Sequence, residues 1–200
     1  MRSKLVPRCI RCRMLVPSCV CDWMPTFELD TRLVLIMHHR ERSKASATAP
    51  LLGACLKNSE IRVHGLKDRP VDIGDLERPD RRVLFLFPSS AATVLTTEML
   101  TADPRPVTLV VPDGNWRQAS HMRRRLPAIG TAEPVRLAMG RQSSWQLRRE
   151  VTDERLSTFE AVARALGLIE SEAVEAALER FFEIMVAAAL KDKASRRMNL

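Results

Sequence analysis

The stretch "LVVPDGNWRQAS", residues 109–120, places a carboxylate, a glycine and an indole directly after an apolar run. Asp113 ends this run, and ligands of open α/β sheets bind where the carboxyl ends of strands open into loops. Gly114 permits the close approach of a ligand or of another backbone segment. Asn115 can cap a following helix, whose amide groups then point at the same spot. We therefore predict a functional role for Asp113, with a simple helix cap as the alternative.

Four cysteines near the start of the sequence have the spacing of a metal site. Cys9 and Cys12 form a C-x-x-C pair, and Cys19 and Cys21 form a C-x-C pair. Two knuckles that face one another bring four thiolates together, and four thiolates fill a tetrahedral Zn²⁺ site without an open position. Residues 1–27 are therefore predicted to be a zinc-binding module in which the metal is structural. Reduced cysteines without metal are the alternative.

The rest of the sequence alternates apolar runs with amphipathic stretches. Strands buried on both faces are predicted at 32–37, 82–87 and 107–111, with a weaker candidate at 134–138. Helices are predicted at 43–56, 91–100, 116–126, 157–168 and 171–191, and a surface loop at 64–82. The alternation predicts an α/β domain over residues 28–200, with a mostly parallel sheet and helices on both faces.

The charge of this basic protein is unevenly distributed. The formal net charge is +8 over 200 residues, of which 46% are hydrophobic, enough for a buried core. Residues 114–149 contain eight arginines and one acid, whereas residues 150–190 contain nine acids and three arginines. A basic middle beside an acidic helical end indicates a surface for a polyanion, and a nucleic acid is the expected partner.

Several protein classes are not supported by the sequence. It contains neither G-x-G-x-x-G nor a P-loop motif, and no apolar run is long enough to span a membrane. An odd number of cysteines without a visible signal peptide argues against a disulfide framework, so we predict a cytoplasmic protein without a membrane partner. The apolar stripe along 173–190 is either internal or a dimer face, which leaves monomer and homodimer open. His38 and His39, for which no partner is evident, are interpreted as loop residues.

Several blocks together resemble the DTW-domain family, whose members are tRNA-uridine aminocarboxypropyltransferases. They are the cysteine cluster, "HHRERSKASATAPLL" (38–52), "FPSS" (87–90), "PDGNWRQASHMRR" (112–124) and "RLSTFEAVARAL" (155–166). The family is related to the SPOUT superfamily, so the resemblance implies a SPOUT-like, knotted core that binds S-adenosylmethionine (SAM) at the strand ends. The usual family motif is D-x-T-W, and Asn115 stands where threonine is expected.

The resemblance implies transfer of the 3-amino-3-carboxypropyl group of SAM to N3 of a uridine in tRNA, with release of methylthioadenosine. Asp113 is the candidate catalytic residue, as proton acceptor or as orienting group. The expected SAM-binding residues are Phe87, Pro88, Ser89, Pro112, Gly114, Trp116, Leu156, Ser157 and Thr158. The expected RNA-binding residues are Lys44, Arg117, Arg124, Arg125, Arg141 and Arg148.

Two other functions fit the same residues. An RNA methyltransferase on the same scaffold differs only in which carbon of SAM faces the base. A non-catalytic, zinc-dependent RNA-binding protein needs the basic surface and the cysteines but no SAM site. The product released from SAM distinguishes the methyltransferase from the aminocarboxypropyltransferase. Measuring SAM binding distinguishes the non-catalytic RNA-binding protein from both.

Overall fold

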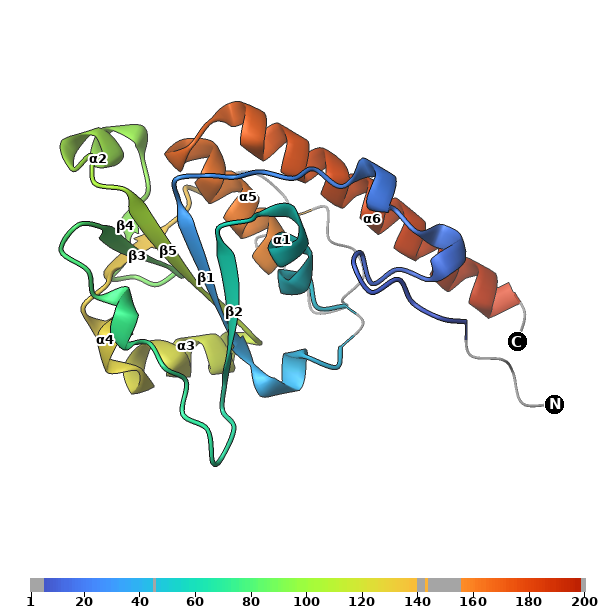
Figure 1. Cartoon of the computed structure of the whole chain (residues 1–200), viewed down its shortest axis with the longest axis horizontal. Helices are drawn as coiled ribbons and strands as arrows, with labels where there is room; N and C mark the ends of the chain where they lie inside the picture. Colours follow the sequence, from blue (N-terminus) through green and yellow to red (C-terminus); the bar gives the residue numbers. More distant parts are fainter. Residues whose placement is uncertain (1–5, 45, 140–142, 144–155, 199–200) are drawn as a thin grey trace.

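A six-stranded, fully parallel sheet forms the centre of the computed structural model (Figure 1), with strand order β2-β1-β5-β3-β6-β4. The model describes residues 6–44, 46–139, 143 and 156–198. The strands are β1 (Arg32–His38), β2 (Ser59–His64), β3 (Arg82–Leu86), β4 (Thr93–Val94), β5 (Val107–Asp113) and β6 (Glu133–Arg136).

Helices cover both faces of this sheet (Figure 1). They are α1 (Ala49–Cys55), α2 (Thr97–Ala102), α3 (Trp116–Arg125), α4 (Pro127–Gly130), α5 (Thr158–Ile169) and α6 (Glu172–Met198). Side chains of α1, α5 and α6 contribute to one hydrophobic cluster, and side chains of α3 and α4 contribute to a second cluster on the opposite face. The predicted mostly parallel sheet with helices on both faces is therefore confirmed. The knotted arrangement stays a prediction.

The two clusters explain why the central strands read as continuous apolar runs. In β1, Leu33 and Leu35 point into the cluster with α5 and α6, whereas Val34 and Ile36 point into the cluster with α3. Successive side chains of a strand point to opposite faces, and both faces of β1 are covered. Hydrophobic burial therefore requires apolar residues at every position.

Two predicted helices are wrong at their amino ends. The helix predicted at 43–56 begins only at Ala49, because Pro50 occupies the first turn, where its missing N–H is tolerated. The helix predicted at 91–100 gives way to strand β4, which pairs with β6. Helix α2 then begins at Thr97, where the Thr96 side chain accepts a hydrogen bond from the backbone N–H of Met99.

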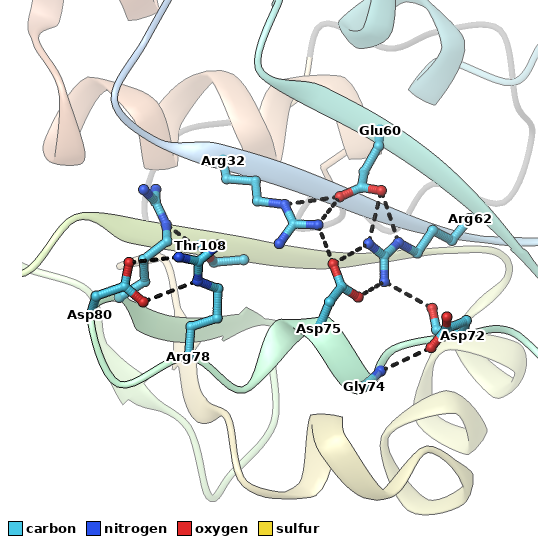
Figure 2. A network of polar contacts seen from close by, with 10 residues as sticks. Arg32, Glu60, Arg62, Asp72, Gly74, Asp75, Arg78, Asp80 and Thr108 are labelled. Atoms are coloured by element: carbon cyan, nitrogen blue, oxygen red, sulfur yellow. Dashed lines mark hydrogen bonds and ion pairs between the residues drawn. The ribbon is translucent and has the colours of Figure 1, made fainter.

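Strand β2 was not predicted, since its sequence "SEIRVH" lacks an apolar run. It is an edge strand, and polar side chains cover part of one face. The carboxylate of Asp75 bridges Arg62, at 2.6 and 2.8 Å, and Arg32, while Glu60 contacts both arginines (Figure 2). Asp75 belongs to the 3-10 turn η4 (Gly74–Leu76). This network, rather than a helix, attaches the segment after β2 to the sheet.

The cysteine-containing segment packs against the same core as the sheet. Cys12, Met14 and Val20 belong to the hydrophobic cluster that contains α6 residues, and the Ser18 hydroxyl donates to Asp192 at 2.6 Å. The division into a module at 1–27 and a domain at 28–200 stays a prediction. Helix α6 is the longest helix, with 27 residues. No helix among the described residues has the length and apolar character needed to cross a membrane.

Candidate active site

Asp113 is the last residue of β5 and is 6% exposed. Its position continues the face of Leu109 and Val111, which point toward α5 and α6. The Thr158 hydroxyl, at the first residue of α5, donates a 2.6 Å hydrogen bond to Asp113 Oδ1. The structure therefore joins two predicted site residues that lie 45 positions apart in the sequence.

The turn after Asp113 is held by a reciprocal helix cap. Asn115 Oδ1 accepts the backbone N–H of Gln118 at 2.9 Å, and Gln118 Oε1 accepts the backbone N–H of Asn115 at 2.8 Å. A Cβ at Gly114 would lie only 2.9 Å from Gln118 Oε1. A larger residue here would therefore displace the Gln118 side chain that caps the helix. Asn115 performs the capping role expected of a threonine in the family motif.

An aromatic pair lies at the start of α3. The rings of Phe87 and Trp116 have centroids 4.9 Å apart, and Phe87 is buried while Trp116 is 49% exposed. Nearby, an Arg123 N–H donates to Ser89 Oγ at 3.3 Å, which connects α3 to the loop after β3. Trp116 is therefore not a core anchor, because half of its surface is available to a ligand.

The amino end of α5 is capped as the S-x-x-E pattern predicts. Ser157 Oγ accepts the backbone N–H of Glu160, and Glu160 Oε2 accepts that of Ser157 at 2.8 Å. Glu160 is buried and also accepts the Ser143 hydroxyl at 2.7 Å, so the cap extends to the connection that precedes α5. These contacts fix Thr158 and, through it, the carboxylate of Asp113.

The other predicted site residues differ in how deeply they are buried. Pro112 is buried in β5, Pro88 is exposed after β3, and Leu156 is half-buried before α5. The predicted RNA-binding residues of α3 are exposed: Arg117, Arg124 and Arg125. Lys44 is also exposed, and its Nζ donates to Oε1 of the buried Glu41 at 2.6 Å. Arg141 and Arg148 lie outside the described residues.

Three histidines lie together at the carboxyl ends of β1 and β2. His38 and His39 were interpreted as loop residues, and no role was predicted for His64. His38 and His64 are paired in register, and the His38 and His39 rings have centroids 4.5 Å apart. His38 Nδ1 lies 3.2 Å from Gln118 Nε2, so the cap after Asp113 contacts this cluster. A histidine pair at the end of a predicted strand was visible in the sequence. Gln118, the partner of His38, lies 80 residues further along the chain.

The four cysteines are brought together as predicted. All four Sγ atoms lie within 4.8 Å of one another, with 3.5 Å between Cys9 and Cys21 and 3.6 Å between Cys12 and Cys19. Zn–S bonds of about 2.3 Å in a tetrahedron place sulfurs about 3.8 Å apart, so the cluster has the size and donor set of a metal site. The separations are too long for disulfides.

The backbone around these cysteines supports a thiolate at Cys9. Backbone N–H groups of Cys12 and Arg11 lower the pKa of Cys9 to about 6, whereas burial raises the pKa of Cys21 to about 12. Arg13, which follows the first pair, has a φ of 62°, a left-handed conformation that closes the knuckle. Its guanidinium donates to the carbonyl oxygens of Arg42 and Lys44, which connects the knuckle to the loop after β1.

A parallel α/β sheet with a buried carboxylate at a strand end, flanked by a capped helix and exposed arginines, is the arrangement at which open α/β proteins bind ligands. The match to the DTW domain model covers residues 6–190, which includes the cysteine cluster. The chain therefore belongs to the DTW domain family.

Curated relatives are similar over most of this chain. The tRNA-uridine aminocarboxypropyltransferase 2 of Mus musculus is 31% identical over 82% of this chain, which covers 57% of that relative's length. The tRNA-uridine aminocarboxypropyltransferase A of Arabidopsis thaliana is 28% identical over 84% of this chain and is covered over 74% of its length. The chain thus spans less than two thirds of the mouse relative.

A solved structure has the same fold. The SAM-dependent rRNA:acp-transferase Tsr3 from Vulcanisaeta distributa superposes with a TM-score of 0.54 at 18% identity, over 82% of this chain and 80% of that one. At this level of identity the likeness concerns the fold.

Proposed function

We propose that this protein transfers the 3-amino-3-carboxypropyl group of SAM to N3 of a uridine in tRNA and releases methylthioadenosine. The observation that carries the proposal is the buried Asp113 carboxylate, held by Thr158 at the carboxyl edge of the sheet, beside Trp116 and the basic helix α3. Curated relatives of this DTW-family chain are named tRNA-uridine aminocarboxypropyltransferases, which supports the transferred group and the uridine acceptor in this proposal.

The reaction requires orientation and the removal of one proton. When SAM is bound, its sulfonium activates the attached γ-methylene carbon. The bond from sulfur to this carbon breaks, its electron pair stays on sulfur, and a bond from the carbon to uracil N3 forms. The N3 proton must leave, and a carboxylate within hydrogen-bond reach can accept it or orient the base. Asp113 is the residue that we assign to this role.

The chemistry of the surrounding residues fits a ligand with an aromatic base and a cationic centre. Phe87 and Trp116 offer an aromatic surface that suits both a base and a cation, and hydroxyls come from Ser89, Ser157 and Thr158. We assign the ligand contacts to these residues and to the backbone of the turns that contain Pro88, Pro112, Gly114 and Leu156.

The exposed arginines of α3 supply the proposed RNA surface. Arg117, Arg124 and Arg125 lie on the helix that begins beside Asp113. Desolvation first, and then the charges of these arginines, lower the pKa of the neighbouring His121. Phosphate contacts position an RNA without reading its sequence, so this face would place a folded tRNA over the site. Lys44, Arg141 and Arg148 are assigned to the same surface. A cytoplasmic location is consistent with a tRNA substrate.

We further infer that residues 1–27 form a module around a structural zinc ion held by Cys9, Cys12, Cys19 and Cys21. The support is the clustering of four thiols together with backbone N–H groups directed at Cys9. Four sulfur ligands leave no position for substrate, so the metal would stabilise the fold.

The experiment that tests the proposal is transfer to unmodified tRNA with purified protein. Wild type is expected to produce aminocarboxypropyl-uridine and methylthioadenosine, both measured by mass spectrometry. Asp113→Ala is expected to abolish transfer while SAM binding, measured by calorimetry, persists. Asp30→Ala, which removes an exposed acid just before the amino end of β1, at the opposite edge of the sheet, is the matched control and should retain activity.

The same assay separates the alternatives. Formation of S-adenosylhomocysteine would identify an RNA methyltransferase. RNA affinity without SAM binding would identify a non-catalytic binding protein. Undiminished transfer by Asp113→Ala would refute the role of Asp113.

A further inference from the structure

His38 is fixed by two hydrogen-bond donors that converge on one ring nitrogen. The backbone N–H of Arg40 points at Nδ1 from 3.3 Å, and the Gln118 amide nitrogen lies 3.2 Å from the same atom. The orientation of that amide is set independently, because Gln118 Oε1 accepts the backbone N–H of Asn115. Since both neighbours are donors, Nδ1 must be an acceptor without a proton, and Nε2 carries the proton of the neutral ring.

This imidazole lies directly beneath the turn that follows Asp113. A Cβ at Gly114 would meet the Cβ of His38 at 3.5 Å and the Gln118 carbonyl oxygen at 2.9 Å. Strands β1 and β5 pair so that Met37 lies opposite Asp113. Asp113 points toward α5 and His38 toward α3, so the two side chains support the same turn from opposite faces of the sheet.

The surroundings of His38 favour the neutral ring. Burial is the largest influence that lowers its pKa, followed by His39 on the adjoining turn, His64 on β2, and Arg40; Glu41 acts in the opposite direction. Gly65, at φ 86°, completes the enclosure, because a Cβ there would lie 3.3 Å from His38 Nε2.

We propose that His38 is a positioning residue for the transfer reaction, which as the neutral Nε2–H tautomer holds Gln118, the Asn115 cap and thereby the Asp113 turn. The inference rests on the proposed function. Protonation of His38 would put an N–H on Nδ1, facing the N–H groups of Arg40 and Gln118. Both hydrogen bonds to Nδ1 would then be lost. The turn would then lose its support, and transfer would slow on the acid side while SAM and RNA contacts remain.

The test compares two substitutions across pH. His38→Leu removes the acceptor and is expected to lower kcat about tenfold, with little change in KM for SAM, since the part-buried Gln118 amide loses the partner that holds it. His38→Asn places Oδ1 as many bonds from Cα as Nδ1 and does not titrate. It is expected to restore most of the transfer and to remove the loss of kcat that we expect of wild type at acidic pH, below the ordinary histidine value of about 6.5.

Two outcomes would overturn the inference: an unchanged kcat in His38→Leu, or an acid-side loss in His38→Asn that equals that of wild type. Thermal unfolding of both variants identifies a folding defect. Long-range ¹H–¹⁵N correlation of the wild-type imidazoles provides an independent readout, with His38→Asn assigning the resonance. A proton on Nδ1 would refute the arrangement without any assay of transfer. Absence of transfer by wild type would instead refute the proposed function itself.

Discussion

Thr158 connects the buried carboxylate of Asp113 to the first turn of α5. Sequence comparison placed both residues in the site but assigned Thr158 to the cofactor. The structure shows that its hydroxyl is directed at Asp113. A hydroxyl donor restricts the rotation of a carboxylate, and the orientation of a catalytic group contributes strongly to rate. Thr158 therefore positions Asp113, whatever further contact it makes.

The hydroxyl of Thr158 is predicted to be necessary for transfer. Thr158→Val preserves the shape of the side chain and removes the donor, and we expect kcat to fall about ten- to hundredfold, as for loss of a hydrogen bond to a charged group. Steady-state kinetics with tRNA measures the effect. Thr158→Ser is the matched control and should retain most activity; equal loss in both variants would contradict this role.

The cap at Asn115 is predicted to tolerate threonine but not alanine. Asn115→Ala is expected to lower the free energy of unfolding by about 1 kcal/mol, because the backbone N–H of Gln118 loses its acceptor. Asn115→Thr, which restores the family motif, is expected to cost only a few tenths of a kcal/mol and to keep transfer activity. Urea denaturation measures both, and a stability loss in Asn115→Thr as large as in Asn115→Ala would be inconsistent with capping.

Among the elements, the segment between β2 and β3 is attached to the sheet by ion pairs as well as by the buried side chains of Ile73 and Leu76. Hydrogen bonds from Arg62 and then Arg32 hold the pKa of Asp75 well below its usual range (Figure 2). Strand β2 carries Glu60 and Arg62 on the face where the inner strands carry apolar residues. An ion-pair network thus replaces hydrophobic cover at the sheet edge.

Asp75→Asn is predicted to destabilise the protein slightly, with the full effect only above about pH 4. The stabilisation by a carboxyl with a depressed pKa is present above its unfolded value, about 3.9, and is lost as pH falls through the lower folded value. We expect a loss of less than about 1 kcal/mol at pH 7, because the network is partly exposed and screened. The difference from wild type should narrow below about pH 4.

Denaturation curves at several pH values test this expectation. Asp68→Asn, in the same segment and exposed, serves as the control and should show no such pH dependence. A constant difference between Asp75→Asn and wild type down to pH 2 would show that the charge of Asp75 is not what stabilises the segment.

At the scale of the whole molecule, side-chain hydrogen bonds join the cysteine-containing segment to the domain, in addition to its packing against the core. Arg13 donates to the loop after β1, and Ser18 on the turn η1 (Val16–Ser18) donates to α6. The loop leads into α1, whose Leu51 and Leu52 belong to the central core. Substitution of the cysteines is therefore expected to alter the positions of residues at the carboxyl edge of the sheet.

Purified protein is predicted to contain about one equivalent of zinc. Cys9→Ser or treatment with a chelator is expected to remove the metal and to lower Tm, because metal binding contributes folding energy to such small segments. Elemental analysis and thermal unfolding measure these effects. Cys55→Ala changes a buried cysteine outside the cluster and should leave the metal content unchanged. Full retention of zinc in Cys9→Ser would contradict the assignment.

The local features of this protein were determined by the sequence. Apolar runs located β1, β3 and β5, the S-x-x-E pattern located the start of α5, and the cysteine spacing indicated a cluster that the structure then brought together. Each of these depends on residues close in the sequence, whose periodicity and hydrogen-bonding capacity act locally. Family motifs supplied the expected roles of Asp113 and its neighbours, which the proposed experiments test.

The contacts between distant residues were decided by the tertiary structure. Strand β2 escaped detection because its polar face acquires partners only when Asp75 and Arg32 fold beside it. The same holds for Thr158 with Asp113 and for His38 with Gln118, which are 45 and 80 residues apart. A side chain's capacity to donate or accept is a property of its type, but its partner depends on how the layers pack. The sequence therefore predicted which residues form the candidate site, and the hydrogen bonds that orient them followed only from the fold.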